Sequence, residues 1–278
     1  MPELPEVETM VRGIRPDCVG RRIDRTLFPP CPCKPIQISP GRRTFITQTE
    51  GQTITAIRRL AKRIMLELDS GRQIVVEPRM TGLMLITDPP TREHRRICFE
   101  LSPARKKASS LEFWDRRGLG TISLLSAEQI LQLESRLGKD ALDISVEDWI
   151  SILARTEREI KVVLLDQSRV AGIGNLYASE ILHEAGISPF RAASRLSGRQ
   201  IQKLANATHR IMHEAISFEG STLSDGTYRN ALNKVGGYQN HHKVYKRADS
   251  LCSTCGKAPI KRALQAQRAT FYCSKCQR

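Results

Sequence analysis

Residues 252–276 read CSTCGKAPIKRALQAQRATFYCSKC, in which two C-x2-C pairs are separated by a seventeen-residue spacer. A two-residue gap lets both thiolates of a pair turn onto one ion, and two such pairs complete a tetrahedral site of four thiolates. Two disulfides are the alternative interpretation, although this spacing is typical of zinc sites. We therefore predict one structural Zn2+ ion, around which the C-terminal segment folds, bound by Cys252, Cys255, Cys273 and Cys276.

The chain is strongly basic, and the segment around these cysteines is more basic still. Its 278 residues carry a formal net charge of +15 and a pI of about 9.8. Between residues 242 and 278 nine lysines and arginines face a single acidic residue, Asp249. Such an excess indicates nucleic acid or an anionic membrane surface as partner. No apolar run approaches the roughly 18 residues of a membrane span, so we predict DNA binding and no membrane association.

The other four cysteines are expected as free thiols. Acidic residues and prolines stand at the N-terminus where a signal peptide would have a basic and then an apolar region, which favours a cytoplasmic protein. Cys31 and Cys33 flank a single proline and could form a second metal or redox pair. Their spacing does not fit a zinc knuckle, so we interpret this stretch, like the surroundings of Cys18 and Cys98, as ordinary structure.

The apolar pattern predicts a multidomain α+β chain. Val7, Met10, Val11 and Ile14 follow the i, i+3, i+4, i+7 spacing of a helix with one buried face. Short β-rich runs follow up to about residue 125, punctuated by glycine and proline, and predict a sandwich or barrel. The chain is then helical to about residue 220, and residues 217–241 predict a long mobile loop. The expected strands are 53–57, 64–68, 73–77, 83–86, 97–101 and 110–114.

The N-terminus is the strongest catalytic candidate. Removal of Met1 would give Pro2 a free secondary amine, and a neutral secondary amine can attack a sugar aldehyde carbon to form an iminium. Glu3 beside it could deliver protons to the opened sugar or the departing base. The structural alternative is an acidic helix start flanked by two loop prolines, and this stretch alone does not exclude it.

Three motifs resemble the formamidopyrimidine-DNA glycosylase family: PELPEVET at residues 2–9, GIGNLYASE at residues 172–180 and the four-cysteine segment. The similarity runs along essentially the whole chain. It implies an N-terminal β-sandwich domain (1–125), a helix-two-turn-helix domain (126–220), a lesion-capping loop and linker (221–241) and a zinc finger (242–278). It also implies a repair enzyme that excises oxidised purines and then cleaves the abasic site by β- and δ-elimination.

Carried over by position, the resemblance makes Pro2 the Schiff-base nucleophile and Glu3 the general acid. Lys62 matches a lysine that reaches the active-site phosphate and assists proton transfer, although a solvated charge at a strand end is its alternative. Arg268 matches an arginine assigned to phosphate binding and δ-elimination. The alternative interpretation is that Arg268 is one more cation on the protein surface.

The same resemblance implies further DNA contacts. Met80, Arg117 and Leu119 would fill the space left by an everted nucleotide. Leu119 stands where the family commonly has phenylalanine. Glycine-flanked backbone at a helix N-terminus would clamp a phosphate. Ordinary strand, helix-cap and surface roles are the alternatives, including core packing for Met80 and exposed helix charge for Lys161. The implied DNA-binding residues are Met80, Arg117, Leu119, Gly172, Gly174, Asn175, His94, Lys161 and Tyr245.

Besides Leu119, two further positions depart from the family pattern. Glu77 replaces a phosphate-contacting histidine and would repel phosphate unless it pairs with Arg79. Thr156 replaces a DNA-binding lysine, with Arg155 and Arg158 close enough to compensate. The expected partner is double-stranded DNA with oxidised bases or abasic sites, bound by a monomer that would be nucleoid-associated in a bacterium. An endonuclease VIII-like enzyme for oxidised pyrimidines and a non-catalytic zinc-finger DNA-binding protein remain as alternatives.

Overall fold

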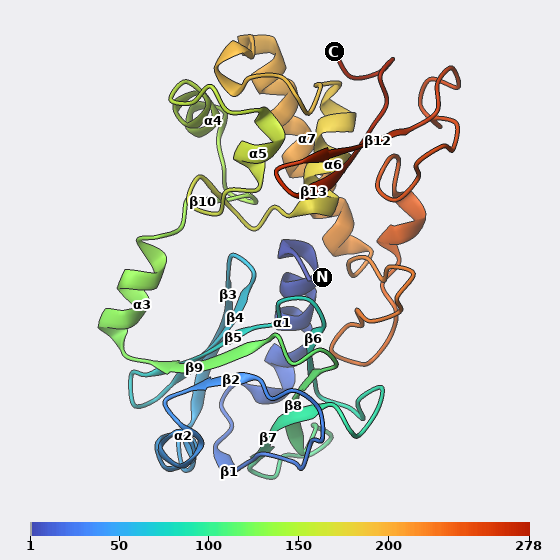
Figure 1. The fold of residues 1–278 in the computed structure, drawn as a ribbon. Coiled ribbons are helices and arrows are strands. Elements are labelled where there is room, and N and C mark those ends of the chain that lie inside the picture. Colours follow the sequence, from blue (N-terminus) through green and yellow to red (C-terminus); the bar gives the residue numbers. More distant parts are fainter. Residues whose placement is uncertain (1) are drawn as a thin grey trace. The chain divides into compact units, whose positions relative to one another are not determined.

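The computed structural model describes residues 2–278, which divide into two compact units (Figure 1). Of the described residues, the first unit comprises 2–135 and 218–239, and the second comprises 136–217 and 240–278. The contacts group the helix that follows residue 126 with the first unit, whereas the sequence places it at the start of the second domain. Met1, and with it the predicted removal of Met1, lies outside the described residues.

The first unit is a two-sheet sandwich with a helix packed against it, which confirms the predicted β-sandwich. One sheet has the order β1-β7-β8-β6 and is antiparallel throughout. The other has the order β2-β9-β5-β4-β3, in which only the β2–β9 pair is parallel. Their bounds are β1 Ile23–Leu27, β2 Gln37–Ser39, β3 Ile54–Leu60, β4 Arg63–Leu68, β5 Gln73–Glu77, β6 Gly82–Leu85, β7 Arg95–Leu101, β8 Ser110–Asp115 and β9 Thr121–Leu125.

The apolar face of α1 (Leu4–Cys18) forms part of the core between these sheets. Val7, Met10, Val11 and Ile14 are fully buried with side chains from both sheets, so the predicted helical spacing is confirmed. Each buried aliphatic side chain contributes roughly 1.5–3 kcal/mol relative to exposure, so this face anchors the start of the chain. The expected strands leave out β1, β2 and β9, and the sequence also missed α2 (Arg42–Thr49). Helix α3 (Ala127–Glu134) completes the unit.

The second unit is built from helices and a terminal β-hairpin. Helix α6 packs against α7, α5 and β13, and α4 packs against α7. Trp149 of α4 and Tyr177 of α6 are fully buried. Its elements are β10 Lys139–Asp140, α4 Val146–Leu153, α5 Ile160–Leu164, β11 Val170–Ala171, α6 Asn175–Ala185, η1 Ala193–Arg195, α7 Gly198–Ser217, β12 Lys261–Gln265 and β13 Arg268–Tyr272, and the short η2 (Tyr238–His241) spans the boundary between the units.

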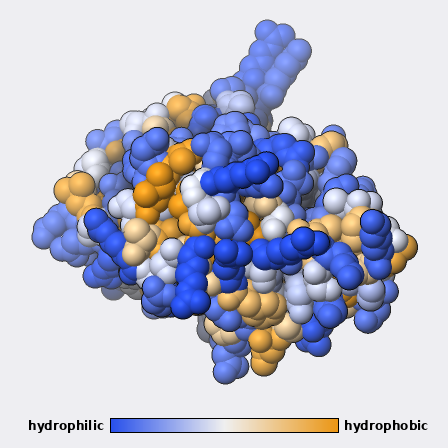
Figure 2. Space-filling view, turned by 90° about the horizontal axis from the view of Figure 1, so that it is seen from above, coloured by the Kyte–Doolittle hydropathy of each residue, from blue (hydrophilic) through white to orange (hydrophobic). Residues whose placement is uncertain are grey.

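Hydrophilic residues dominate the surface drawn in Figure 2, where apolar residues form separate patches. Within residues 2–278, no helix is both long enough and apolar enough to cross a membrane.

Candidate functional site

The helix start holds Pro2 and Glu3 in a buried position. Glu3 is the N-cap of α1 and is only 3% exposed. The Glu6 carboxylate accepts a hydrogen bond from the Glu3 amide at 2.9 Å and a second from the Ser221 amide at 2.9 Å. One carboxylate therefore fixes the backbone of the candidate catalytic pair and also ties it to the segment that begins at residue 218.

Lys62 lies in the two-residue turn between β3 and β4. Leu60 pairs with Arg63, and Ala61 has a φ of 54°, so the turn is tight. Arg59 donates to the Glu8 carboxylate of α1 at 2.9 Å and to the Ala61 carbonyl at 3.1 Å. Burial alone would raise the pKa of Glu8, but the guanidiniums of Arg12 and Arg59 hold it below its ordinary value. A charged bridge thus ties the Lys62 turn to the helix that carries Glu3.

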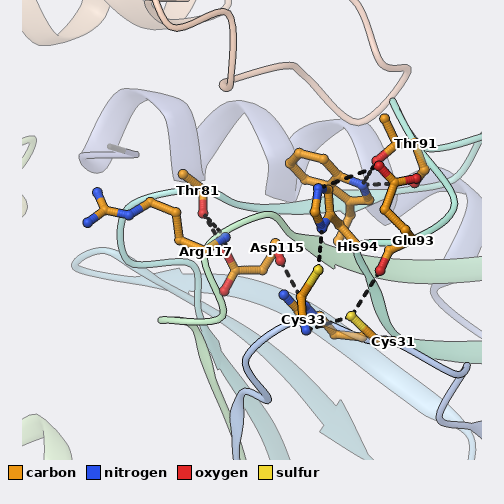
Figure 3. Close-up of polar contacts among 10 residues, drawn as sticks. Cys31, Cys33, Thr81, Thr91, Glu93, His94, Asp115 and Arg117 are labelled. Carbon is orange, nitrogen blue, oxygen red and sulfur yellow. Dashed lines mark hydrogen bonds and ion pairs between the residues drawn. The ribbon is translucent and has the colours of Figure 1, made fainter.

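Thr81, which follows Met80 in the chain, and Arg117 lie in two turns that share the Asp115 carboxylate (Figure 3). The Thr81 hydroxyl donates to Asp115, which is fully buried. The Arg117 amide donates to the Thr81 hydroxyl at 3.0 Å and to Asp115 at 3.2 Å. The Met80 side chain is 37% exposed, so it is not a core methionine. Leu119 is half-buried in the same turn as Arg117. The structure therefore brings the three candidate space-filling residues onto neighbouring turns.

His94 packs edge-on against the Trp114 ring, with ring centroids 5.4 Å apart. Its Nδ1 lies 3.4 Å from the Cys33 sulfur, and its Nε2 lies 3.7 Å from the Glu93 carboxylate (Figure 3). The ring is therefore fixed on three sides, and it lies next to the cysteine pair that the sequence assigned to an ordinary loop.

The two departures from the family pattern have different surroundings. Glu77 lies 3.2 Å from Arg79 and 3.3 Å from Arg63, so its charge is compensated as the sequence analysis required. Near Thr156, Arg158 is already paired with Asp166 at 2.7 Å. Arg155 is exposed and is the better substitute for the missing lysine.

Residues 218–239 contain little regular secondary structure but pack tightly. Tyr228 and Ala231 belong to the core of the first unit, and the Tyr228 hydroxyl donates to the Glu219 carbonyl at 3.0 Å. A Cβ on Gly13 of α1 would lie 2.6 Å from the Ala231 Cβ, so only glycine permits this approach. The sequence predicted a long mobile loop; the structure shows a loop that is anchored to α1 at Ser221, Tyr228 and Ala231.

In the second unit, Gly172 and Gly174 form the turn into α6. The Gly172 φ of 101° is a conformation that favours glycine, and its amide donates to the Gln167 side chain at 2.9 Å. The same side chain donates to the Ile173 carbonyl at 2.8 Å. Gly174 is the N-cap of α6, so Asn175 occupies the first helical position. The turn is therefore preorganised at a helix N-terminus, where backbone N–H groups favour anions.

Lys161 is 1% exposed, which contradicts the interpretation of an exposed helix charge. Its ammonium donates to the Ala269 carbonyl at 3.0 Å and to the Thr270 hydroxyl at 2.7 Å. The Asn175 side-chain amide donates to the same Ala269 carbonyl at 3.0 Å. Lys161 and Asn175 thus secure the strand residue that follows Arg268, and the DNA contact expected of Lys161 stays a prediction.

Arg268 is exposed at the tip of the β12–β13 hairpin. It pairs with Gln265, and the two turn residues between them, Ala266 and Gln267, have φ values of 46° and 62°. Two positive φ values are typical of the tight turn that matches strand twist. A cation at such a tip, on backbone secured through Ala269, is well placed to contact a polyanion.

Tyr245 is positioned from two sides. Its ring lies edge-on to Phe271 at 5.4 Å, and its amide donates to Glu180 at 2.8 Å. The Glu180 carboxylate, 1% exposed, also accepts from the amides of Lys243 at 2.8 Å and Val244 at 3.1 Å. Burial raises the pKa of Glu180, and the three amide donors oppose that shift.

The four C-terminal cysteines converge as the sequence predicts. Their sulfurs all lie within 4.8 Å of one another, with Cys252–Cys276 at 3.8 Å and Cys255–Cys273 at 3.7 Å. Thiolates about 2.3 Å from a tetrahedral ion lie about 3.8 Å apart, whereas disulfide sulfurs lie about 2.05 Å apart. The arrangement suits a metal ion, and the disulfide alternative is wrong because all four cysteines are free.

His183 of α6 lies beside this cluster. Its Nε2 is 3.6 Å from the Cys252 sulfur. Burial, together with the charge of Lys243, lowers the pKa of His183 to about 4, so the ring is neutral at neutral pH.

Several positioning residues escaped sequence analysis. Glu6 and Glu180 stand inside the motifs PELPEVET and GIGNLYASE, but Glu6 also accepts from an amide 215 residues away, and Glu180 accepts from amides 63–65 residues away. Asp115 and Arg59 likewise act through folded contacts. The available signal was an acidic residue inside an otherwise apolar helix face, and it does not identify the partner.

Comparisons with known proteins agree with this arrangement. The profile of the formamidopyrimidine-DNA glycosylase N-terminal domain matches residues 1–122, and that of the family's H2TH domain matches residues 137–227. The formamidopyrimidine-DNA glycosylase of Chloroflexus aurantiacus is 35% identical over 279 residues, covering 100% of this chain and 98% of the relative. That of Herpetosiphon aurantiacus is 36% identical, with 100% of both chains covered.

Solved structures align over the same length. The MutM (Fpg) protein of Thermus thermophilus has a TM-score of 0.85 at 32% identity, covering 99% of this chain and 98% of that chain. A Lactococcus lactis Fpg variant in complex with DNA containing Fapy-dG has a TM-score of 0.87 at 29% identity, with 100% of both chains covered. Because both domain profiles match in order and the relatives align from end to end, this chain belongs to the formamidopyrimidine-DNA glycosylase family of DNA-binding repair glycosylases.

Proposed function

We propose that the protein is a bifunctional glycosylase and abasic-site lyase for oxidised purines, namely 8-oxoguanine and formamidopyrimidines. The observation that carries this proposal is the buried helix start, where Glu6 holds the Glu3 amide next to Pro2. A protein that only binds duplex DNA has no need of an acid and an imino residue fixed at one helix start. Similarity to Lactococcus lactis complexes containing Fapy-dG or an abasic site favours this substrate class.

The proposed chemistry begins with the Pro2 nitrogen, freed by removal of Met1. It attacks C1′ of the damaged nucleotide as the base leaves, and the resulting iminium withdraws electrons for β-elimination. Glu3 supplies the proton for sugar opening or base departure. Lys62 assists proton transfer at the adjacent phosphate, and Arg268 supports the second elimination at the other phosphate.

The remaining contacts are proposed to hold bent DNA around an everted nucleotide. Met80, Arg117 and Leu119 fill the vacated space, with Arg117 facing the orphaned base. Gly172, Gly174 and Asn175 bind phosphate at the helix N-terminus. His94 and Tyr245 contact the backbone.

We propose that Zn2+ is the ion of the four-cysteine cluster, because an all-thiolate tetrahedral site is typical of structural zinc. It would hold the β12–β13 hairpin and thereby the backbone that carries Arg268. We expect the protein to act on DNA as a monomer, in the cytoplasm of a bacterium and at its nucleoid.

A substrate panel tests the proposal. Duplexes carrying 8-oxoguanine opposite cytosine, a formamidopyrimidine, an oxidised pyrimidine or an abasic site are incubated with the protein under single-turnover conditions. We expect fastest excision of the purine lesions and a one-nucleotide gap with phosphate at both ends. Faster release of the oxidised pyrimidine would favour the endonuclease VIII-like alternative. Binding without cleavage of any duplex would favour the non-catalytic alternative.

A further inference from the structure

The loop between β1 and β2 contains a second arrangement of cysteines that lies outside the proposed DNA chemistry. Cys31 and Cys33 flank Pro32, and both thiols are half-buried. Two residues of chain span at most about 7 Å. Disulfide-bonded residues have Cα atoms about 4.4–6.8 Å apart, so an i, i+2 pair on a bent chain falls within reach. The Cys31 thiol also helps to raise the pKa of Cys33, so the two groups lie close enough to influence one another.

A buried cation faces the first of these sulfurs. Arg96 is 5% exposed, and its Nη1 lies 2.8 Å from the Cys31 sulfur. Its other partners are the carbonyls of Asp115 at 2.8 Å and Lys34 at 2.9 Å, and its Nη2 is buried with no hydrogen-bond partner. Among residues 2–278, no carboxylate pairs with Arg96. The guanidinium therefore has both an unused donor and an uncompensated charge beside a thiol.

This geometry distinguishes the two cysteines. The Cys31 thiol donates to the Glu93 carbonyl at 2.9 Å and lies 2.8 Å from the Arg96 guanidinium, so the Cys31 sulfur is the one that faces a cation. Burial and the adjacent Cys31 raise the pKa of Cys33, which therefore stays protonated. His94 Nδ1 lies 3.4 Å from the Cys33 sulfur. The Glu93 carboxylate lies 3.7 Å from Nε2, so Nδ1 is the ring nitrogen that faces the Cys33 thiol.

The site is also open to a small reagent. A pocket of about 150 Å³ is lined by both cysteines and by Arg96, together with Arg42 and Arg95. A water molecule occupies about 30 Å³ in the liquid, so a molecule of the size of hydrogen peroxide fits.

We propose that Cys31 and Cys33 form a peroxide-reactive dithiol that closes to an intramolecular disulfide. The Cys31 sulfur attacks a hydroperoxide: an S–O bond forms, the O–O bond breaks, and the departing oxygen takes the thiol proton and leaves as water or alcohol. The Cys33 sulfur then attacks the sulfenic sulfur, an S–S bond forms, and the hydroxyl leaves as water with the Cys33 proton relayed by His94. Two thiols lose two electrons and one peroxide is reduced.

A metal ion is the weaker interpretation of this pair. Within the described part of the chain, only the four C-terminal cysteines converge closely enough to hold one. The Cys31 sulfur is instead directed at the Glu93 carbonyl and the Arg96 guanidinium.

The test uses the full-length, zinc-loaded protein and stoichiometric hydrogen peroxide, followed by alkylation, trypsin digestion and mass spectrometry. Residues 26–42 form one tryptic peptide that contains both cysteines, because Pro35 protects the bond after Lys34. We expect this peptide to lose two hydrogens before the zinc-finger peptides react, and to regain them with a thiol reductant. Cys98→Ser, at a buried thiol, is the matched control and should behave like the wild type.

Variants assign the roles. In Cys33→Ser, dimedone should trap a sulfenic acid on Cys31, whereas Cys31→Ser should give little adduct on Cys33. Arg96→Gln should slow disulfide formation about tenfold, since the thiolate loses its cation. The proposal is overturned if the 26–42 peptide keeps both thiols while the zinc finger oxidises, or if Cys31→Ser and Cys33→Ser react equally. It is also overturned if the pair carries a second metal equivalent that Cys31→Ser lacks.

Discussion

The start of α1 and the tip of the β12–β13 hairpin are supported in opposite ways. Glu3 is buried and is held by the first turn of its own helix through Glu6. Arg268 is exposed, and its strand is secured through Ala269 by Lys161 and Asn175, which are distant in sequence. The difference indicates that the candidate reacting groups depend on local helix geometry and burial. The candidate phosphate-binding group depends on long-range contacts and on the hairpin that joins the two cysteine pairs.

Removing the metal should have the largest effect, because it disrupts the support of the β12–β13 hairpin. Cys273→Ser, or a strong chelator, is expected to abolish metal binding and to lower DNA affinity at least a hundredfold, because structural zinc can contribute on the order of 10 kcal/mol to folding. Metal content by mass spectrometry and binding by fluorescence anisotropy check this. Cys98→Ser is the control and should retain both. A metal-free protein with unchanged affinity would contradict the role given to the cluster.

Glu6→Gln should have the next largest effect, on the helix-start side. The glutamine amide nitrogen must face either the Glu3 or the Ser221 amide, which leaves a buried donor without an acceptor at about 1–3 kcal/mol. We expect base excision to slow roughly 10- to 100-fold with DNA affinity nearly unchanged, as measured by single-turnover kinetics. Glu128→Gln on the exposed face of α3 is the control. If Glu6→Gln lost DNA binding but kept its rate of base excision, Glu6 would support DNA binding and not the candidate catalytic pair.

Lys161→Met tests whether the buried lysine positions the hairpin. Methionine fills the space, Asn175 still donates to the Ala269 carbonyl, and the Thr270 hydroxyl still donates to Gln265, so the unit should remain folded. Affinity for damaged duplex is expected to fall about tenfold, since two hydrogen bonds from a charged donor are lost. Lys203→Met, at an exposed α7 position, should change nothing. Equal effects of the two variants would mean that Lys161 acts only through net charge.

Arg268→Ala should have the smallest effect on affinity, but a specific one. Loss of one phosphate contact is expected to reduce the slope of log affinity against log salt by about 0.9. Titrations at several salt concentrations measure this, with Arg199→Ala on α7 as a matched surface control. An unchanged slope would remove Arg268 from the phosphate contacts.

Local patterns predicted much of the fold. The α1 face, the position of most strands and the cysteine cluster follow from spacing over a few residues, and all three are confirmed. Helix α2 was missed because it is short and rich in threonine, a poor helix former. Its formation depends on the burial of Phe45 against the sandwich, which is a tertiary contact.

The supporting contacts of the candidate site were beyond the sequence for the same reason. The hydrogen-bond partners of Lys161 lie 108 and 109 residues away in the sequence. The two carboxylate oxygens of Glu6 accept from backbone amides that lie 3 and 215 residues away. From the sequence alone, a charged residue on a short helix is expected to be exposed, because its hydrogen-bond partner is not known. The family resemblance supplied candidate positions, and the fold supplied the contacts that position them.

Borohydride trapping tests the central claim most directly. The protein is incubated with an 8-oxoguanine:cytosine duplex and borohydride, and the covalent complex is digested and sequenced by mass spectrometry. We predict that the sugar is attached to the nitrogen of Pro2 at a mature terminus that lacks Met1. An N-terminal extension that cannot be removed should abolish the adduct while leaving duplex binding intact. An adduct on Lys62, or cleavage of damaged DNA by protein that retains Met1, would contradict the account.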